Sequence, residues 1–317
     1  RVIKMVSRVT NLSSQKLISS LILKSQDRIN DAQVKLATQQ KSQNYLGIAE
    51  DSKRLVTVES SVRRIEQFEQ DNKFVKMRMQ SMMHSMDGLS DIISDVKGLL
   101  REILDDGNLP PGMDKDEIAE LKMDEISMFL NTKINGRFLF AGTKTDTKPI
   151  QEGNLASAPT FNADGVTTTA EPTFYYKGDD GQVKARIDEG VTLEYGINAN
   201  ESGFEKLIRS LRIIKSTSLT DANANGKFLH TLDLMNQASD EITAVELKTG
   251  IRFKQLDNVN KNLENTKAVL QGVVTDIERA DTFETVAELN QVQTQLEASY
   301  TTAVRVSSLT LANFLRR

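Results

Sequence analysis

The sequence predicts a mainly α-helical protein, in which the N- and C-terminal segments form a long coiled-coil bundle around a small β-rich inserted domain. Three observations predict this class. Both ends carry apolar residues at helical spacing, and one stretch in the first third carries an unbroken coiled-coil pattern. Helix-ending residues gather in the middle: all five prolines lie between residues 110 and 172, and 11 of the 17 glycines lie between 107 and 203.

The N-terminal segment contains neither glycine nor proline before residue 47 and predicts one amphipathic helix. Its apolar residues recur in steps of three and four, with Ser25 in the one polar position. They are Ile18, Ile22, Ile29, Ala32 and Leu36. So narrow an apolar face predicts pairing with another helix.

The C-terminal segment, residues 284–317, also lacks glycine and proline and carries a second stripe. The stripe consists of Leu289, Val292, Leu296, Tyr300, Ala303 and Val306. We expect the two terminal helices to pair with each other and with copies of the same chain, and to fray without such neighbours. The outer hairpin of an ordinary helical bundle is the open alternative.

Nine apolar residues in the first third of the chain predict a coiled-coil seam, because they step strictly by four and three. They are Val75, Met79, Met82, Met86, Leu89, Ile93, Val96, Leu100 and Ile103. Upstream, apolar residues from Leu55 to Phe68 continue the seam with two successive steps of three, which should overwind the coil locally. The methionines are expected in the core rather than on a binding surface.

After a break at residues 105–112, a second helix is predicted to start at Asp114, with Glu117 completing a capping box. It should stop at Asn135-Gly136, before an extended segment, RFLFAG. Residues 173–187 predict a β-hairpin that turns at 178–181, and residues 191–197 alternate as a half-buried strand.

Helix is predicted to return at Ser202, capped with Glu205, and a very long helix should carry apolar residues from Phe228 to Ile277. An interruption near residues 280–282 precedes the terminal helix. The predicted domains are therefore a terminal coiled-coil assembly domain, a helical bundle domain and an outward-facing β-rich insert. Their bounds are 1–42 with 283–317, 43–145 with 200–282, and 146–199, respectively.

Composition excludes several classes of protein. Hydrophobic residues make up 38% and aromatic residues 5%, with no tryptophan, as in long helical bundles rather than in large enzyme cores. The net charge of −4 and interspersed charges argue against nucleic-acid binding. No cysteine is present, which removes disulfides and thiolate chemistry. No long apolar run or Sec-type leader is recognisable, so we expect no membrane insertion, solubility at synthesis, and any export by another route.

Candidate catalytic residues are few. The only histidines, His84 and His230, are expected on a helix surface or at a core edge. Carboxylates cluster at residues 105–106, 114–117 and 179–180, which are helix ends and a turn, and none matches a calcium loop. Phosphate-binding glycine motifs are absent. We expect no enzyme, no cofactor and no metal.

Two stretches resemble the flagellin superfamily: residues 293–317, QTQLEASYTTAVRVSSLTLANFLRR, and residues 134–150, INGRFLFAGTKTDTKPI. Within it, the chain is most similar to the hook-associated protein 3 family, whose members join hook and filament. The second stretch discriminates best, because Phe-Ala-Gly followed by Thr, Lys and Asp is typical of that family. The matching motif residues are Asn135, Gly136, Arg137, Phe138, Phe140, Ala141 and Gly142.

The resemblance implies a secreted structural adaptor of the extracellular bacterial flagellum, exported by the type III apparatus with a chaperone. Its implied partners are copies of itself, hook-associated protein 1 on the hook side and flagellin on the filament side. Assembly would use the terminal helices, so the expected interface comprises Ile18, Ile22, Ile29, Leu36, Leu289, Val292, Leu296, Tyr300, Ala303, Val306, Leu309 and Phe314.

Two alternatives stay open. The chain could be a short flagellin that forms the filament itself. In a different class, it could be a secreted ligand-binding or adhesin-like protein that uses the β insert, with Tyr175, Tyr176 and Tyr195 as stacking residues.

Overall fold

The computed structural model describes residues 2–49, 51–106, 112–151, 155, 157–170 and 175–315. The chain is mainly helical, with two small antiparallel sheets, which confirms the predicted class. It divides into two compact units, one formed by residues 1–63 and 266–317 and the other by residues 64–265. The three-domain division remains a prediction.

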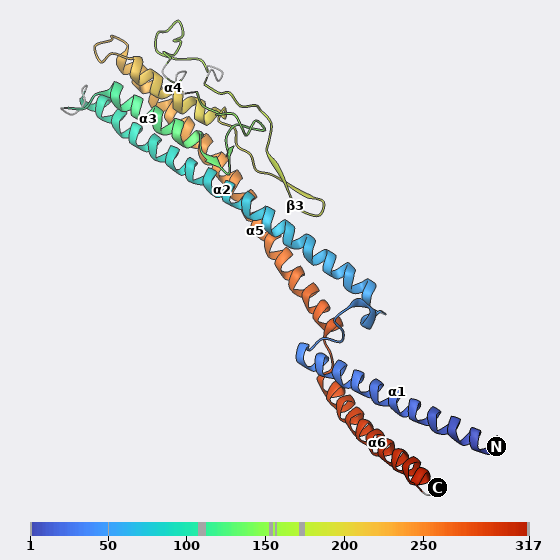
Figure 1. Ribbon diagram of the computed structural model, residues 1–317. Helices are drawn as coiled ribbons and strands as arrows, with labels where there is room; N and C mark the ends of the chain where they lie inside the picture. The colour runs from blue at the N-terminus through green and yellow to red at the C-terminus, as the bar shows by residue number, and fades with distance from the viewer. Residues whose placement is uncertain are drawn as a thin grey trace. The chain divides into compact units, whose positions relative to one another are not determined.

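The first unit is built on two long helices, α1 (Val2–Thr38) and α6 (Thr282–Leu315), which run side by side and bring both termini to the same end of the pair (Figure 1). Gln39 adopts a positive φ of 59° and ends α1. Asp281 starts α6, because its Oδ1 accepts hydrogen bonds from the backbone N–H groups of Phe283 and Glu284. The interruption predicted near residues 280–282 is therefore confirmed.

A short 3₁₀ helix, η1 (Tyr45–Ile48), follows α1. The backbone N–H of Lys41 donates to Glu278 O (2.7 Å), and that of Ala280 donates to Gln39 O (2.9 Å). These bonds form an antiparallel β-bridge between Gln40 and Arg279. The break after α1 and the break before α6 thus lie against each other.

The second unit contains most of α2 (Ser52–Asp106) and α5 (Ala224–Glu278), together with α3 (Lys115–Leu130) and α4 (Ser202–Ser216) (Figure 1). All nine residues of the predicted seam are buried in its core, which confirms the prediction. Facing them are apolar residues from α3, α4 and α5, such as Ile126, Leu211 and Met235. The long helix predicted over residues 228–277 is confirmed as α5.

Both predicted capping boxes are wrong in detail. Asp114 does cap α3, but its Oδ1 accepts from the N–H of Asp116 (2.8 Å). Glu201, rather than Ser202, occupies the N-cap of α4, without a side-chain capping bond. Glu205 instead pairs with Arg209. The guanidinium of Arg209 is nearly buried, and a buried charge without an opposite charge beside it would be strongly destabilising.

The first sheet is a hairpin of β1 (Lys133–Ile134) and β2 (Arg137–Phe138). Helix α3 ends at Leu130, earlier than expected, and Asn135-Gly136 forms the hairpin turn with φ of 50° and 79°. Left-handed backbone at both turn residues is what an Asn-Gly sequence favours. The Asn-Gly pair therefore turns a hairpin rather than ending the helix.

The second sheet pairs β3 (Lys184–Asp188) with β4 (Val191–Glu194). The hairpin predicted over residues 173–187 is thus wrong in its strand pairing: residues 184–188 pair with 191–194 across a turn at 189–190, and Tyr176 bridges to Ile150. Burial explains the difference, since Tyr175 is fully buried and the Tyr176 hydroxyl donates to Asp179 O (2.6 Å). Thr173 and Phe174 lie outside the described residues.

Candidate assembly surface

The predicted terminal stripes lie where α1 and α6 pack against each other. Val292 is 1% exposed and Ala32 2%, while Ser25, the one polar position, is also buried. The other predicted residues with described side chains are half-buried, except Tyr300, which is exposed. These half-buried residues are Ile18, Ile22, Ile29, Leu36, Leu289, Leu296, Ala303 and Val306. Leu309 and Phe314 lie outside the described side chains.

Two polar contacts tie the helices together at the edges of this seam. Arg28 Nη2 lies 2.7 Å from Glu288 Oε1, and Gln26 Nε2 donates to the Tyr300 hydroxyl at 2.9 Å. Both contacts are solvent-exposed, so each adds little stability. The pair is therefore held mainly by its thin apolar seam.

The pair also exposes large apolar side chains outside the predicted stripes. Phe283 is 89% exposed and Val304 is 69% exposed. Leu17, Leu21, Leu23, Val34 and Val286 are exposed as well. We call these seven residues the outer apolar set. Two helices cannot cover so much apolar surface by themselves, and such exposure marks interaction sites in folded proteins.

The outer apolar set is not predicted by the stripe spacing, because none of its residues falls on that spacing. The available signal was the extra apolar content beside each stripe. Leu17 and Leu21 each precede a stripe residue, and Leu23 follows one. A seam flanked by further apolar residues is wider than one helix partner can cover.

The motif of residues 135–142 has a structural role in the second unit. Phe140 and Ala141 are fully buried, and the Phe140 ring meets Phe204 edge-on at 6.3 Å between centroids. Gly142 has a φ of 69°, and a Cβ there would lie 2.2 Å from Asp179 O. The motif thus anchors the end of the β1–β2 hairpin against α4 and the turn at Asp179.

Asp179 closes this turn. Its Oδ1 accepts from the backbone N–H groups of Thr143 (2.6 Å) and Gly181 (3.2 Å), and its Oδ2 accepts from the Thr143 hydroxyl. These bonds, led by that from the Thr143 hydroxyl, lower the pKa of Asp179. The carboxylate is therefore a structural acceptor that holds two loops together.

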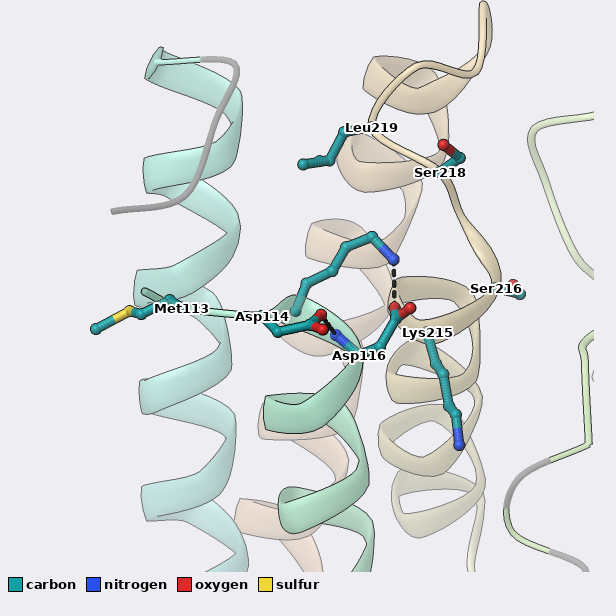
Figure 2. Close-up of a pocket in the computed structure, with 8 residues that line it drawn as sticks. Met113, Asp114, Asp116, Lys215, Ser216, Ser218 and Leu219 are labelled. Carbon is teal, nitrogen blue, oxygen red and sulfur yellow. Dashed lines mark hydrogen bonds and ion pairs between the residues drawn. The ribbon is translucent and has the colours of Figure 1, made fainter. Parts of the chain in front are cut away.

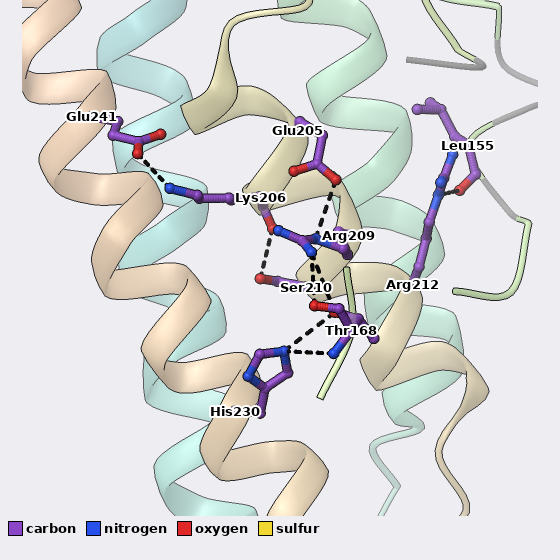
Figure 3. A network of polar contacts seen from close by, with 9 residues as sticks. All are labelled: Leu155, Thr168, Glu205, Lys206, Arg209, Ser210, Arg212, His230 and Glu241. Atoms are coloured by element: carbon purple, nitrogen blue, oxygen red, sulfur yellow. Dashed lines mark hydrogen bonds and ion pairs between the residues drawn. The ribbon is translucent and has the colours of Figure 1, made fainter. Parts of the chain in front are cut away.

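A buried polar network joins the insert to α4 and α5 (Figure 3). Arg209 Nε lies 3.1 Å from Glu205 Oε1, and both side chains are nearly buried. Arg209 Nη1 donates to Thr168 O (3.2 Å), and Arg212 Nε donates to Leu155 O (2.7 Å). The two arginines of α4 thus hold backbone carbonyls of the insert in place.

His230 on α5 completes the network, since its Nε2 accepts a hydrogen bond from the backbone N–H of Thr168 (3.2 Å). An accepting Nε2 is unprotonated, so the proton of the neutral ring lies on Nδ1. Burial, followed by the nearby Arg209, lowers the pKa of His230. His230 is thus half-buried at the core edge, as predicted, and His84 is exposed on α2.

An open pocket of about 670 Å³ lies between the start of α3 and the end of α4 (Figure 2). Its charges are already engaged: Asp114 caps α3, Lys115 pairs with Asp116, and Lys215 lies 3.6 Å from Glu120. The pocket therefore presents no activated nucleophile or base, and we assign it no catalytic role.

Two of the three tyrosines suggested for ligand stacking are not accessible. Tyr175 and Tyr195 are buried, and the Tyr195 hydroxyl accepts from Arg78 (3.2 Å), so neither presents a ring for stacking. Across the described residues, no three metal-ligating side chains cluster. In that same part of the chain, no helix is long and apolar enough to span a bilayer.

Known flagellar proteins resemble this chain in sequence or in fold. Residues 232–315 match the family described as the bacterial flagellin C-terminal helical region. A solved structure described as a flagellar hook-associated protein from Vibrio parahaemolyticus has a TM-score of 0.55 at 15% identity, covering 72% of this chain and 97% of that one. Flagellar hook-associated protein 3 from Legionella pneumophila gives 0.54 at 10%, covering 70% and 98%. No curated protein matches the sequence.

Residues 232–315 therefore match a flagellin-type C-terminal helical region, and the chain shares the fold of these solved hook-associated proteins. Its particular resemblance to hook-associated protein 3, seen first in two sequence stretches, is confirmed by the shared fold.

Proposed function

We propose that the chain is a structural adaptor of the bacterial flagellum, which joins a hook-side junction protein to the flagellin filament through its terminal helices. The observation that carries this proposal is the outer apolar set on the α1–α6 pair, which a single chain leaves in water. Covering such a set with neighbouring helices would contribute roughly 25 cal/mol for each Å² of apolar surface buried. The fold of hook-associated proteins and the flagellin-type region support the same role.

The partners proposed are copies of the chain, hook-associated protein 1 on the hook side, flagellin on the filament side and a type III export chaperone. The place of action is outside the cell, at the hook–filament junction. No residue is assigned a catalytic role. In this proposal, residues 1–42 and 283–317 assemble, residues 43–145 and 200–282 form the rigid bundle, and residues 146–199 face outward.

Substitutions on α6 test the proposal in a strain that lacks the natural gene and carries the variant. Val304→Asp places a charge on the outer apolar set without touching the α1–α6 seam. Burying that unpaired carboxylate in an assembled ring would cost several kcal/mol. Electron microscopy should show hooks without filaments, and flagellin should collect in the medium.

Thr302→Asp provides the matched control, because Thr302 is an exposed polar residue two positions away on the same helix. It should leave filaments normal. Val292→Asp, at the buried seam, should also loosen the pair in the isolated protein. Normal filaments with both Val304→Asp and Phe283→Asp would refute the role of the outer apolar set.

A filament-forming flagellin is the second candidate, and the match of residues 232–315 to the flagellin C-terminal region favours it. Ammonium sulfate precipitation of the purified protein separates the two candidates. A flagellin should give long filaments under these conditions, and an adaptor should not.

A further inference from the structure

The solvent face of α5 carries an ordered set of charges in the second unit. Five residues follow one another at intervals of seven: two acids, one apolar residue and two bases. They are Asp233, Asp240, Leu247, Lys254 and Lys261. All five are exposed, Leu247 by 64%, and the neighbouring Ile251 is 71% exposed. We call these six residues the α5 column.

Helix geometry places the α5 column on one side of α5. Seven residues make almost two full turns, so the column drifts by only about 20° per step. It extends over about 42 Å of helix at 1.5 Å per residue. The opposite side of α5 is in the core, where Met235, Ile242 and Leu256 are buried. The column therefore lies outside the core of the second unit.

The four charges of the α5 column have no ion-pair partner among the described residues. Asp233 accepts a hydrogen bond from Gln237, its neighbour on the same helix (2.8 Å), and lies near His230 without forming an ion pair with it. Other charges along α5 behave differently, since Asp257 pairs with Lys76 and Glu241 pairs with Lys206. The column thus presents exposed charges of both signs, none of them in an ion pair among the described residues, around an exposed apolar centre.

We propose that the α5 column binds a second copy of the chain, with the two α5 helices antiparallel and Leu247 lying opposite its own counterpart. In this arrangement Asp240 faces Lys254 of the partner subunit, and Asp233 faces Lys261 of the partner subunit. The two-fold symmetry repeats both contacts, so all eight charges find an opposite one. Ile251 and Leu247 of both copies form the centre.

Charge order selects the antiparallel arrangement over the parallel one. Parallel helices in the same register would place acid against acid and base against base, which is unfavourable at every charged position. In an antiparallel pair, the column of one copy meets the column of the other copy in reverse order. Each acidic residue then faces a basic residue of the partner subunit. Because the ion pairs stay close to water, the association should be weak and should weaken further as salt rises.

Single cysteines test the arrangement directly, because the chain contains none. Under mild oxidation of the folded full-length protein, Leu247→Cys should form a disulfide-linked dimer. Asp240→Cys alone and Lys254→Cys alone should link poorly, but an equimolar mixture of the two should link well. Leu121→Cys, exposed on α3, is the matched control and should not link.

Charge exchange tests the energetics by sedimentation at low and high ionic strength. Asp233→Lys with Asp240→Lys should weaken self-association about ten-fold or more, since it makes the column uniformly basic. Adding Lys254→Asp and Lys261→Asp to the same chain should restore the wild-type association, because the order of signs is reversed but still complementary.

Each result decides the proposal. Specific linkage at residue 247, together with loss and recovery in the charge variants, supports it. Linkage at residue 240 as efficient as at residue 247 would refute the antiparallel arrangement. Failure of the four-fold variant to recover association, or no linkage above the Leu121→Cys control, would refute the interface itself. None of these outcomes depends on the proposed flagellar role.

Discussion

Asn72 Nδ2 donates a hydrogen bond to Asn260 Oδ1 at 2.7 Å, which joins α2 and α5 through two side-chain amides in the middle of an apolar bundle. The same nitrogen donates to the Ile187 carbonyl at 2.9 Å, so β3 is held at this point as well. Asn72 is fully buried. Buried amides between paired helices fix their register, since any slip leaves a polar group unpaired.

Asn72→Ala should destabilise the protein by about 1–3 kcal/mol, because the Ile187 carbonyl and the Asn260 amide both lose a donor. Urea denaturation measures the loss, and hydrogen exchange should rise first in residues 184–194. Gln67→Ala, an exposed residue on the same helix, is the control and should change little. Equal effects of the two substitutions would contradict the role of the amide pair.

Two glycines of α2 should respond to alanine with opposite signs. A Cβ on Gly88 would lie 2.3 Å from Cζ of Phe129, so the ring must move and stability should fall by about 1–3 kcal/mol. Nothing lies within 4 Å of a Cβ on Gly98, so Gly98→Ala should stabilise α2 by about 0.5–1 kcal/mol. Thermal denaturation compares them. A stabilising Gly88→Ala would show that Phe129 does not pack there.

Gly142 and Gly190 separate backbone strain from steric contact. Both have left-handed φ, 69° and 77°, so alanine at either position should cost about 1–2 kcal/mol. Only at Gly142 would the new Cβ also strike the Asp179 carbonyl, at 2.2 Å. Gly142→Ala should therefore be clearly the more destabilising in urea denaturation. Equal losses would mean that the contact with Asp179 carries no weight.

The His230 contact predicts a dependence of stability on pH. Because burial lowers the pKa of His230 in the folded state, the unfolded chain takes up the proton first as pH falls through 6.5. The free energy of unfolding should hold steady above this range and decline below it, until the folded-state pKa is reached. Asp164, Arg209 and Asp233 are the charged groups nearest the ring.

His230→Gln should flatten this decline, because the glutamine carbonyl can accept from Thr168 without titrating. Urea denaturation at several pH values between about 5 and 8 provides the measurement, in the range where histidine titrates. His84→Gln, on the exposed face of α2, serves as the control for the second histidine. An unchanged slope in His230→Gln would contradict the assignment.

The helices were predictable because long periodic patterns are local and redundant. The nine seam residues from Val75 to Ile103 are all buried, as their spacing required. The β insert was less predictable, because its pairing depends on contacts far away in the sequence. Tyr176 pairs with Ile150 rather than with the segment after its own turn, and no local propensity distinguishes these partners.

The candidate assembly surface shows the same limit. Periodicity located the seam between α1 and α6, but it could not say which flanking residues a single partner helix leaves exposed. Phe283 illustrates this, since its 89% exposure follows from the start of α6 at Thr282, which Asp281 fixes. The charge order of the α5 column is visible in sequence only once the buried side of α5 is known.

The bridge between Gln40 and Arg279 bears on how the first unit would respond to mechanical load. A torsional force on α1 and α6 reaches the rest of the unit through two chain segments, the one after α1 and the one before α6. The backbone hydrogen bonds of Lys41 and Ala280 join these two segments side by side. Because the two segments are hydrogen-bonded to each other, they should turn together when one of them is twisted.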